Sequence, residues 1–149
     1  MEAKVWYSIE NTTKPSIEEN PDHDFLIIEL DDSNSFEHFG YIKNTVEAFN
    51  SLIEWEDMWS MEEASLRFKQ GDKLYLLRDN KGALGHIWFA NFYMYNLFVH
   101  PRRKEGFSEK FVKNCISRID EPEIFCYCDS WNIRAQKFLE KVGFMKINS

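Results

Sequence analysis

Short runs of apolar residues, bounded by turn-forming residues, predict the strands of this chain. Residues 79–82, Asp-Asn-Lys-Gly, can adopt positive φ and separate two of these runs, so they predict an antiparallel hairpin. Residues 11–24 are rich in Asn, Thr, Pro and Glu and predict a surface loop. The predicted strands are residues 5–9, 25–30, 74–77, 84–89, 93–99 and 124–128.

Apolar residues spaced three and four apart predict two helices in the first half of the chain. The first carries a continuous stripe from Phe36 to Ile53, which we expect to be core. Ser60 and Glu63 form a capping box, in which each side chain satisfies a backbone N–H of the other residue. A second helix is therefore predicted over residues 61–69.

Two further helices are predicted in the second half. Asp129 or Ser130 is expected to cap the last helix, and Gly143 is expected to end it. The apolar positions are Phe107, Phe111, Cys115 and Ile119 in the third helix, and Ala135, Phe138, Leu139 and Val142 in the fourth.

Length and composition indicate one folded domain. The chain has 149 residues, of which 44% are apolar and 29% charged, values close to globular averages. No run approaches the ~18 apolar residues of a membrane span, and residues 1–6 lack the layout of a secretory signal. The odd count of three cysteines agrees with a reducing compartment. We expect one cytoplasmic domain over residues 1–149, with no membrane partner.

Charge is unevenly distributed along the chain. The formal net charge of −7 argues against simple nucleic-acid binding. Residues 1–70 hold 16 Asp or Glu and 5 Lys or Arg, whereas residues 71–149 hold 9 and 13. Either the two halves face different partners, an acidic half for a cation and a basic half for phosphate, or surface charge has drifted by chance.

Residues 97–108 combine a strand end, a basic loop and a helix start. Arg102, Arg103 and Lys104 supply positive charge, and Gly106 lets the backbone approach a ligand closely. The free N–H groups and the positive dipole end of a helix favour an anion. This pattern indicates either a phosphate site or a solvated turn.

Two motifs resemble signatures of the GNAT superfamily of N-acetyltransferases. Residues 99–101, Val-His-Pro, followed by residues 103–108, Arg-Lys-Glu-Gly-Phe-Ser, resemble the family's V-x-P and (Q/R)-x-x-G-x-(G/A), which binds the pyrophosphate of coenzyme A. Residues 132–144 resemble the second signature, N-x-x-A followed by an aromatic position, E-K and G-F. The resemblance covers roughly residues 74–144, and the order of elements fits the family from Phe25 onward.

This resemblance implies an α/β fold: a single GNAT-like domain whose mixed, mainly antiparallel central sheet is flanked by helices. It implies an N-acetyltransferase that transfers an acetyl group from acetyl-CoA, without a metal, to an amine, small and cationic or on a protein. Backbone N–H groups of the strand over residues 97–99 would polarise the thioester carbonyl. The implied cofactor-binding residues are Leu97, Phe98, Val99, Arg102, Arg103, Lys104, Glu105, Gly106, Phe107, Ser108, Asn132 and Phe138.

The chain departs from the family pattern at three places. Ser108 replaces Gly or Ala, and its hydroxyl can donate to phosphate. Leu139 stands where many members carry a tyrosine that protonates the leaving thiolate, so water, Tyr127 or a thiol of Cys126 or Cys128 would have to do so. The last hairpin is expected to be truncated, with the N-terminal strand or a second subunit of a homodimer covering the sheet edge.

No spacing singles out a general base. The candidates are Tyr95, Asn96, His86, Glu54 and Asp57, and catalysis through water alone is the alternative. His86 lies within an apolar strand, where a hydrogen-bonded core histidine is the alternative interpretation. We take Tyr95, Asn96 and Tyr127 as the catalytic candidates.

Residues 54–59 mix carboxylates and aromatics where the family forms its acceptor site. We expect Glu54, Trp55 and Asp57 to contact a cationic amine, with Trp55 or Trp59 stacked on it. The alternative is a solvated helix end. Cys126 and Cys128 are interpreted as buried free thiols, because side chains at i and i+2 of a strand are too far apart to bridge.

Two other function classes remain open. Leu139 favours an acyl-CoA-binding module that has lost turnover. A truncated last hairpin favours an interaction protein on the same fold. Steady thiol release from acetyl-CoA in the presence of an amine would exclude both as complete accounts.

Overall fold

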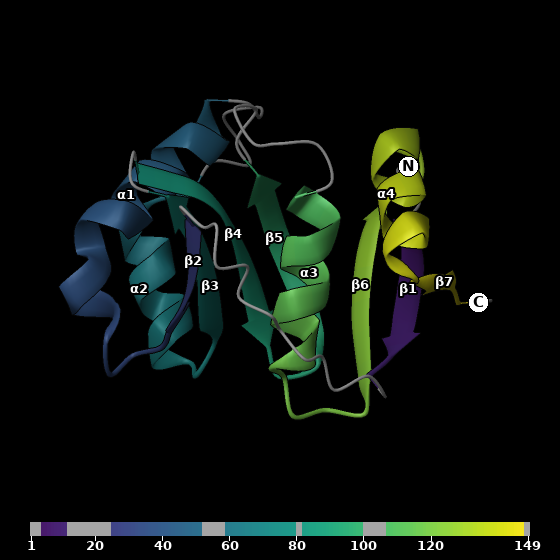
Figure 1. Cartoon of the computed structure of the whole chain (residues 1–149), viewed down its shortest axis with the longest axis horizontal. Helices are drawn as coiled ribbons and strands as arrows, with labels where there is room; N and C mark the ends of the chain where they lie inside the picture. Colours follow the sequence, from purple (N-terminus) through teal and green to yellow (C-terminus); the bar gives the residue numbers. More distant parts are fainter. Residues whose placement is uncertain (1–3, 12–24, 52–58, 80–81, 100–106, 148–149) are drawn as a thin grey trace.

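A computed structural model describes residues 4–11, 25–51, 59–79, 82–99 and 107–147 of the chain (Figure 1). The elements in chain order are β1 (Lys4–Glu10), β2 (Phe25–Leu30), the 3₁₀ helix η1 (Ser35–His38), α1 (Phe39–Asn50), α2 (Met61–Lys69), β3 (Lys73–Asp79), β4 (Gly82–Ala90), β5 (Tyr93–Val99), α3 (Phe107–Ser117), β6 (Glu123–Asp129), α4 (Ile133–Val142) and β7 (Met145–Lys146).

One seven-stranded sheet runs through the molecule in the order β2-β3-β4-β5-β6-β1-β7. All neighbouring strands are antiparallel except β5 and β6, which are parallel. A parallel pair needs a crossover connection, and α3 provides it. The expected fold class, a mixed and mainly antiparallel sheet flanked by helices, is confirmed.

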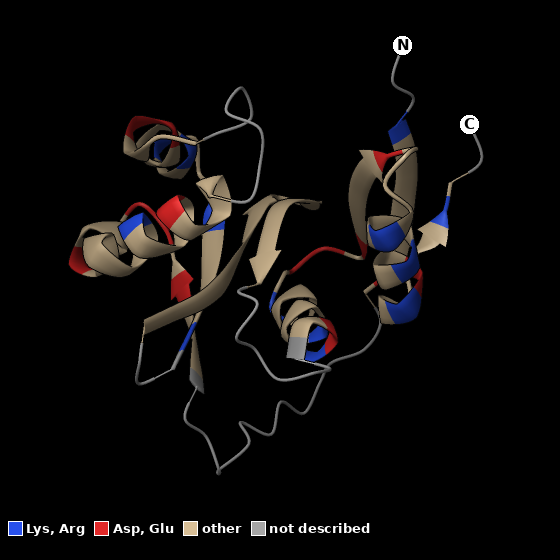
Figure 2. Ribbon diagram, turned by 90° about the horizontal axis from the view of Figure 1, so that it is seen from above, with Lys and Arg blue, Asp and Glu red and all other residues tan. Residues whose placement is uncertain are grey.

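Helices cover the two faces of the sheet over different strands. α1 and α2 pack on one face against β2, β3 and β4, through a cluster that includes Ile42, Phe68 and Trp88. α3 and α4 pack on the other face, where Val112 and Leu139 join the larger cluster. Figure 2, seen from above, shows these two layers on opposite sides of the strands.

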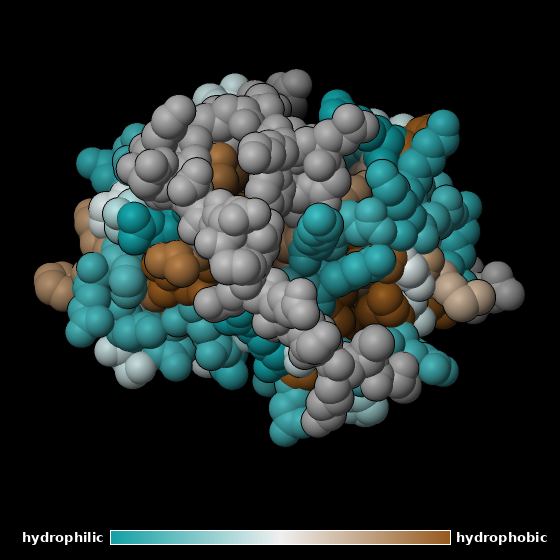
Figure 3. Space-filling model, viewed as in Figure 1, coloured by the Kyte–Doolittle hydropathy of each residue, from teal (hydrophilic) through white to brown (hydrophobic). Residues whose placement is uncertain are grey.

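Strand burial separates the middle of the sheet from its β6–β1 side. Residues 74–77 of β3 and 84–89 of β4 are all buried, because helices lie on both of their faces. β6 and β1 alternate instead, and Trp6 of β1 is 43% exposed. The surface on the α3 and α4 side is mostly hydrophilic, with apolar side chains visible in patches (Figure 3).

The expected core stripe of the first helix is wrong at its start. Phe36 is 88% exposed, because it lies in η1, whose three-residue turn rotates its side chains out of phase with those of α1. Phe39, the first residue of α1, is also 49% exposed, whereas Ile42 and Val46, farther along, are buried as expected. Ile53, the end of the predicted stripe, lies outside the described residues.

Most of the predicted helix and turn signals are confirmed. Ser60 Oγ accepts from the Glu63 N–H at 3.1 Å, which is one half of the predicted capping box, whereas the Glu63 carboxylate accepts from Arg67. Gly143 caps α4 with a φ of 122°. The expected cap of α4 is wrong: Asn132, rather than Asp129 or Ser130, accepts from a backbone N–H of the helix. β3 and β4 form the predicted hairpin.

β1 fills the sheet edge that the sequence leaves open beyond β6. It pairs with β6 from Lys4 to Glu10 and with β7 at two residues. Just after β1, Asn11 Nδ2 donates to the carbonyls of Ile116, Ile119 and Glu121 at 3.1, 2.8 and 2.9 Å. These bonds attach β1 to the C-terminal end of α3. Of the two expected ways to cover the edge, the N-terminal strand is the one observed.

Among the described helices, none is both long and apolar enough to cross a membrane.

Candidate functional site

β5 and β6 meet at one residue pair, Tyr93 with Phe125. The Phe125 N–H donates to the Phe92 carbonyl at 2.8 Å. Within the described residues no further pair joins these strands, and Figure 1 shows them diverging toward Val99 and Asp129. Facing strand edges that are not joined as a sheet can bind an extended ligand as an added strand. This junction is therefore the candidate site.

A bulge in β5 lies beside the junction. In the pairing with β4, Phe98 stands opposite His86 and Tyr95 opposite Trp88, so two residues of β5, Asn96 and Leu97, face Ile87 alone. Asn96 has a φ of 50°, a left-handed conformation that asparagine tolerates better than most residues. An added residue in one strand bends it and re-aims its side chains.

Gly85 of β4 allows β5 to approach closely beyond the bulge. A Cβ on this residue would lie 2.5 Å from the Phe98 carbonyl oxygen and 3.1 Å from the Val99 Cα. Both neighbours belong to the backbone and cannot rotate away. Only glycine is compatible with this arrangement.

His86 connects α1 to the bulge through two short hydrogen bonds. Its Nε2 lies 2.7 Å from Asn96 Oδ1, and its Nδ1 lies 2.7 Å from Thr45 Oγ1. An amide oxygen only accepts, so Nε2 carries the proton and donates, and the Thr45 hydroxyl donates to Nδ1. Burial lowers the pKa of His86 to about 4. The neutral, fully hydrogen-bonded ring matches the core-histidine interpretation.

Tyr95 lies on β5 just before the bulge, and its hydroxyl donates to Asp72 Oδ2. Burial and then this hydrogen bond raise the pKa of Tyr95. The guanidinium of Arg67 lies 5.2 Å from the Tyr95 ring centroid and 5.3 Å from that of Trp59. The phenol and the buried carboxylate thus form a hydrogen-bonded pair beside a cation.

Aromatic side chains form a row across β4, β5, β6 and β1, on the face that carries α1 and α2. Neighbouring ring centroids in the row are 5.0 to 6.2 Å apart. The row begins in the core and ends at the surface. Lys4 Nζ lies 4.3 Å from the outermost tyrosine ring. The members of this aromatic row are Trp88, Tyr95, Tyr93, Tyr127 and Trp6.

Tyr127 is 37% exposed and lies two residues beyond the junction on β6. Burial, followed by a hydrogen bond with Tyr127, raises the pKa of Tyr93. Two thiols are on the same strand, but Cys126 belongs to the core cluster of the opposite face. Burial raises the pKa of Cys126 to about 12 and also raises that of Cys128. Both are free thiols, as expected, but only Cys126 is buried, whereas Cys128 is partly exposed.

The predicted cofactor residues that the structure describes belong to three elements, β5, α3 and α4. Leu97, Phe98 and Val99 end β5 beyond the bulge. Ser108 lies in the first turn of α3, and Asn132 is the N-cap of α4, accepting from the Ala135 N–H at 3.1 Å. Phe138 is half-buried against the core cluster. Residues 102–106 lie outside the described residues, as does the Phe107 side chain.

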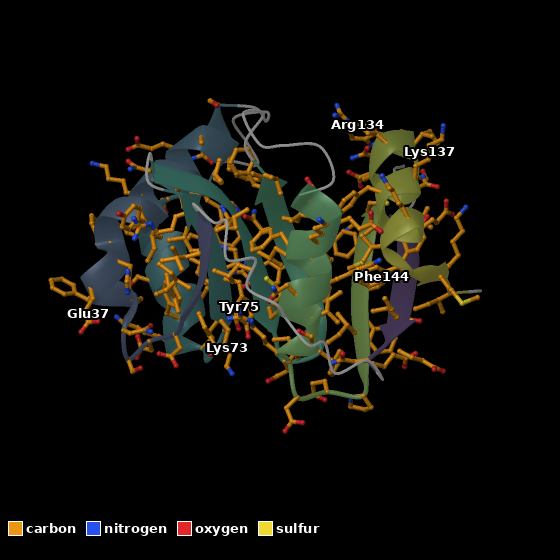
Figure 4. All side chains as sticks on the ribbon, viewed as in Figure 1. Glu37, Lys73, Tyr75, Arg134, Lys137 and Phe144 are labelled. Carbon is orange, nitrogen blue, oxygen red and sulfur yellow. The ribbon has the colours of Figure 1, made fainter. Side chains whose placement is uncertain are left out.

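Helix α4 carries basic side chains at its surface. Arg134 and Lys137 are exposed on its N-terminal part, whereas Phe144 after the helix is buried (Figure 4). Leu139, at the position of the family's tyrosine, is buried in the core cluster.

The predicted acceptor residues Glu54, Trp55 and Asp57 lie outside the described residues. Trp59, the alternative stacking residue, packs beside Trp88, the first member of the aromatic row, with 5.4 Å between ring centroids. No cluster of three or more metal-ligating side chains occurs among the residues that the structure describes.

Three residues near the site were missed at the sequence level. Thr45 is a polar residue inside the apolar stripe of α1, which was the available signal. Tyr93 aligns with Tyr95 by strand alternation and could have been found from it. Asp72, buried beside Tyr95, follows a helix-ending glycine, and nothing in its local pattern indicated a partner on a distant strand.

No family model matches the sequence, and no curated protein matches it. Solved structures do resemble it. A functionally unknown conserved protein from Staphylococcus epidermidis has a TM-score of 0.64 at 9% identity, covering 98% of this chain and 58% of its own. A protein described as an acetyltransferase from the GNAT family of Novosphingobium aromaticivorans has 0.61 at 15%, covering 99% and 61%.

An aminoglycoside acetyltransferase from an uncultured soil metagenomic sample has a TM-score of 0.60 at 14% identity, covering 82% of this chain and 89% of its own. The chain thus spans about three fifths of the first two structures and a larger part of the third. At these identities the likeness shows the fold. The chain has the fold of GNAT acetyltransferases, as the resemblance implied.

Proposed function

We propose that this protein is an N-acetyltransferase that transfers an acetyl group from acetyl-CoA to a cationic amine. The observation that carries the proposal is the junction of β5 and β6, which are paired at one position and then diverge beside a bulge. A parallel strand pair that opens in this way offers backbone groups to an extended molecule such as pantetheine. The shared fold with acetyltransferases supports the same assignment.

In the proposed complex, the phosphates lie at the start of α3. Arg102, Arg103, Lys104, Glu105 and Gly106 provide the loop, and Ser108 provides a hydroxyl. The N-terminal end of α3 follows that loop, so its dipole and free N–H groups favour the same anion. The pantetheine arm then passes Leu97, Phe98 and Val99 on one side and Asn132 and Phe138 on the other.

The chemistry requires proton transfers at two atoms. The reacting nitrogen first loses its ammonium proton to solvent water. The neutral amine nitrogen then forms a bond to the acetyl carbon while the carbon–sulfur bond breaks, so that the nitrogen loses its second proton and the sulfur gains one. Tyr95 accepts the amine proton as its own proton moves to Asp72. Asn96 shapes the bulge whose peptide groups polarise the carbonyl. Tyr127 protonates the sulfur, in place of the tyrosine that Leu139 replaces.

A cationic acceptor suits the aromatic row. The chain's own cations, Lys4 and Arg67, already lie against its rings, so these rings accept positive charge. An acceptor ammonium would occupy the same faces, with Glu54, Trp55 and Asp57 completing its site. The similarity to an aminoglycoside acetyltransferase supports a small amine as the acceptor.

Calorimetric titration of acetyl-CoA into the wild type and into Arg103→Ala/Lys104→Ala tests the cofactor site. We expect saturable binding that weakens at least about tenfold in the variant, because two phosphate contacts are lost. Lys43→Ala/Lys69→Ala is the matched control, since it removes the same charge from exposed positions of α1 and α2. Absence of binding by the wild type would overturn the proposal.

The rival function is an acyl-CoA-binding module without turnover. Leu139, buried at the position of the family's proton donor, is the observation that favours it. Thiol release, followed with a chromogenic disulfide across a panel of primary amines, separates the two functions. Binding of acetyl-CoA without thiol release for any amine would favour the rival.

A further inference from the structure

We propose that His86 is a positioning residue for acetyl transfer, which acts through Asn96 to hold the bulge of β5 in register. The proposal rests on the proposed function, because the bulge lies where the donor thioester would bind. His86 itself is too buried to touch a substrate, with 1% of its surface exposed.

The bulge decides which face of the sheet each residue of β5 presents. Before it, Met94 packs in the α3 and α4 cluster and Tyr95 against the α1 and α2 cluster. Beyond it, Leu97 and Val99 pack in the α3 and α4 cluster. Strict alternation from Met94 would place both on the opposite face, because side chains alternate with a period of two.

The residue just before this change of face is Asn96. Its side chain is hydrogen-bonded to His86, which contacts α1 through Thr45. The side chains of Tyr95 and Asn96 therefore both lie on the face of the sheet that carries α1 and α2. Two consecutive residues on one face require the bulge. The left-handed φ of Asn96 is the backbone conformation that accommodates this bulge.

His86 selects this register because its ring offers one donor in a fixed place. Thr45 donates to Nδ1, which leaves the Nε2–H to donate to Asn96 Oδ1. In the unbulged register Asn96 would face away, and the Nε2–H would be buried without this acceptor. A buried donor without a partner is strongly unfavourable. The ring of Phe98, which lies 5.6 Å from His86 between centroids, packs beside it only when the bulge is present.

The consequence falls on the peptide groups of Leu97, Phe98 and Val99. In the proposed function, these peptide groups polarise the thioester carbonyl and line the adjoining part of the pantetheine arm. A change of register would rotate them and misplace the donor carbonyl. Small displacements of a reacting group have large effects on kcat.

The test compares His86→Leu, His86→Gln and Val46→Ala in acetyl-transfer kinetics. His86→Leu removes the donor, and we expect kcat to fall at least about tenfold with a smaller change in the KM of the amine. His86→Gln keeps an N–H that can reach Asn96, and it should recover most of kcat. Val46→Ala is the control, because it opens the same helix face and leaves both hydrogen bonds of His86 in place.

Amide chemical shifts of Asn96 and Leu97 provide a readout that does not depend on turnover. We expect them to move in His86→Leu and to return toward wild-type values in His86→Gln. Asn96→Ala serves as the second variant if His86→Leu does not fold, with the same expected loss of kcat.

Unchanged amide shifts in His86→Leu, or an equal loss of kcat in Val46→Ala at an equal folded fraction, would overturn the proposal. Absence of acetyl transfer by the wild type would instead contradict the proposed function. The amide shifts would still decide whether His86 holds the bulge.

Discussion

Two antiparallel blocks of the sheet meet at one residue pair, and they differ in how they are covered. The block of β2, β3, β4 and β5 has helices on both faces, and its inner strands are buried along consecutive residues. The block of β6, β1 and β7 has α4 on one face, whereas Trp6 and Tyr127 are exposed on the other. The covered block holds most of the buried core, and the proposed catalytic side chains of Tyr95, Asn96 and Tyr127 lie where it joins the open block.

This division explains why the polar network lies where it does. Tyr95 and Asn96 lie on β5, the strand of the covered block that faces the junction, and His86 lies on the neighbouring strand β4. There they are buried enough to be held rigidly, yet they adjoin strands that are not paired. A site built on paired strands and packed helices is positioned more firmly than one built on loops.

We expect the largest loss of stability from a substitution that forces β4 and β5 apart beside the junction. Gly85→Val would place side-chain atoms against the backbone of Phe98 and Val99. We expect the free energy of unfolding to fall by about 3 kcal/mol or more, because backbone atoms must move. Urea denaturation measures it.

Gly40→Ala is the matched control for this change. A Cβ on Gly40, in α1, would have no atom within 4 Å, so this variant should gain about 0.5–1 kcal/mol from helix propensity. If the urea midpoint of Gly85→Val were unchanged, β4 and β5 could separate at Gly85 without a loss of stability. The covered block would then not be the more tightly packed of the two.

Low pH should reduce the free energy of unfolding, because His86 is buried in the covered block. The pKa of its ring is lowered to about 4 by burial, against about 6.5 in an unfolded chain. Between these values the unfolded chain binds a proton that the folded chain excludes. The free energy of unfolding therefore falls as the pH is lowered from 6.5, by about 3 kcal/mol at pH 4.

Urea denaturation at pH 7 and at pH 4.5, in the wild type and in His86→Gln, measures this contribution. The variant lacks the group, whereas all other titrating groups are common to both proteins. Equal pH dependence in the two proteins would exclude His86 as the source.

The open block should respond less strongly, because fewer contacts hold it. Asn11→Ala removes three hydrogen bonds that join the residue after β1 to carbonyls in the last turn of α3 and just beyond it. We expect a loss of about 2 kcal/mol and faster hydrogen exchange in β1 than in β3. Asn44→Ala, at an exposed position of α1, is the control. Equal hydrogen-exchange rates in β1 and β3 would indicate that the sheet unfolds as one cooperative unit. The two blocks would then not differ in stability.

The sequence predicted the covered block well for a physical reason. Its strands are continuous apolar runs, and its hairpin and caps use residues with strong local preferences, such as Gly82 and Ser60. Local signals of this kind do not depend on distant contacts. The exceptions are Phe36 and Phe39, which are exposed where a 3₁₀ turn passes into α1 and breaks a periodicity that looked continuous.

The junction could be predicted only in part. The motifs around Gly106 and Asn132 indicated the fold and the cofactor, but they do not specify a bulge. The bulge depends on Asn96 meeting His86, and His86 on meeting Thr45, which lies 41 residues away in the sequence. The pair of Tyr95 and Asp72 is likewise nonlocal. Hydrogen bonds between distant elements leave no periodic trace in the sequence.

The smallest expected effect concerns the outer end of the aromatic row. Lys4 lies against the ring of Tyr127 at the surface of the open block, where a cation–π contact contributes about 0.5 kcal/mol or less. Lys4→Ala should therefore change the free energy of unfolding by no more than this. It should also free the ring face for an acceptor ammonium and lower the amine KM about twofold, which steady-state thiol release measures.

Lys146→Ala removes the same charge from an exposed position of the neighbouring strand β7. If both variants lower KM equally, the effect is a general change of surface charge, and Tyr127 is not an ammonium site. If only Lys4→Ala does so, the ring itself binds the acceptor. The exposed face of the open block would then be where the substrate binds, next to the edge of the covered block, on which Tyr95 and Asn96 lie.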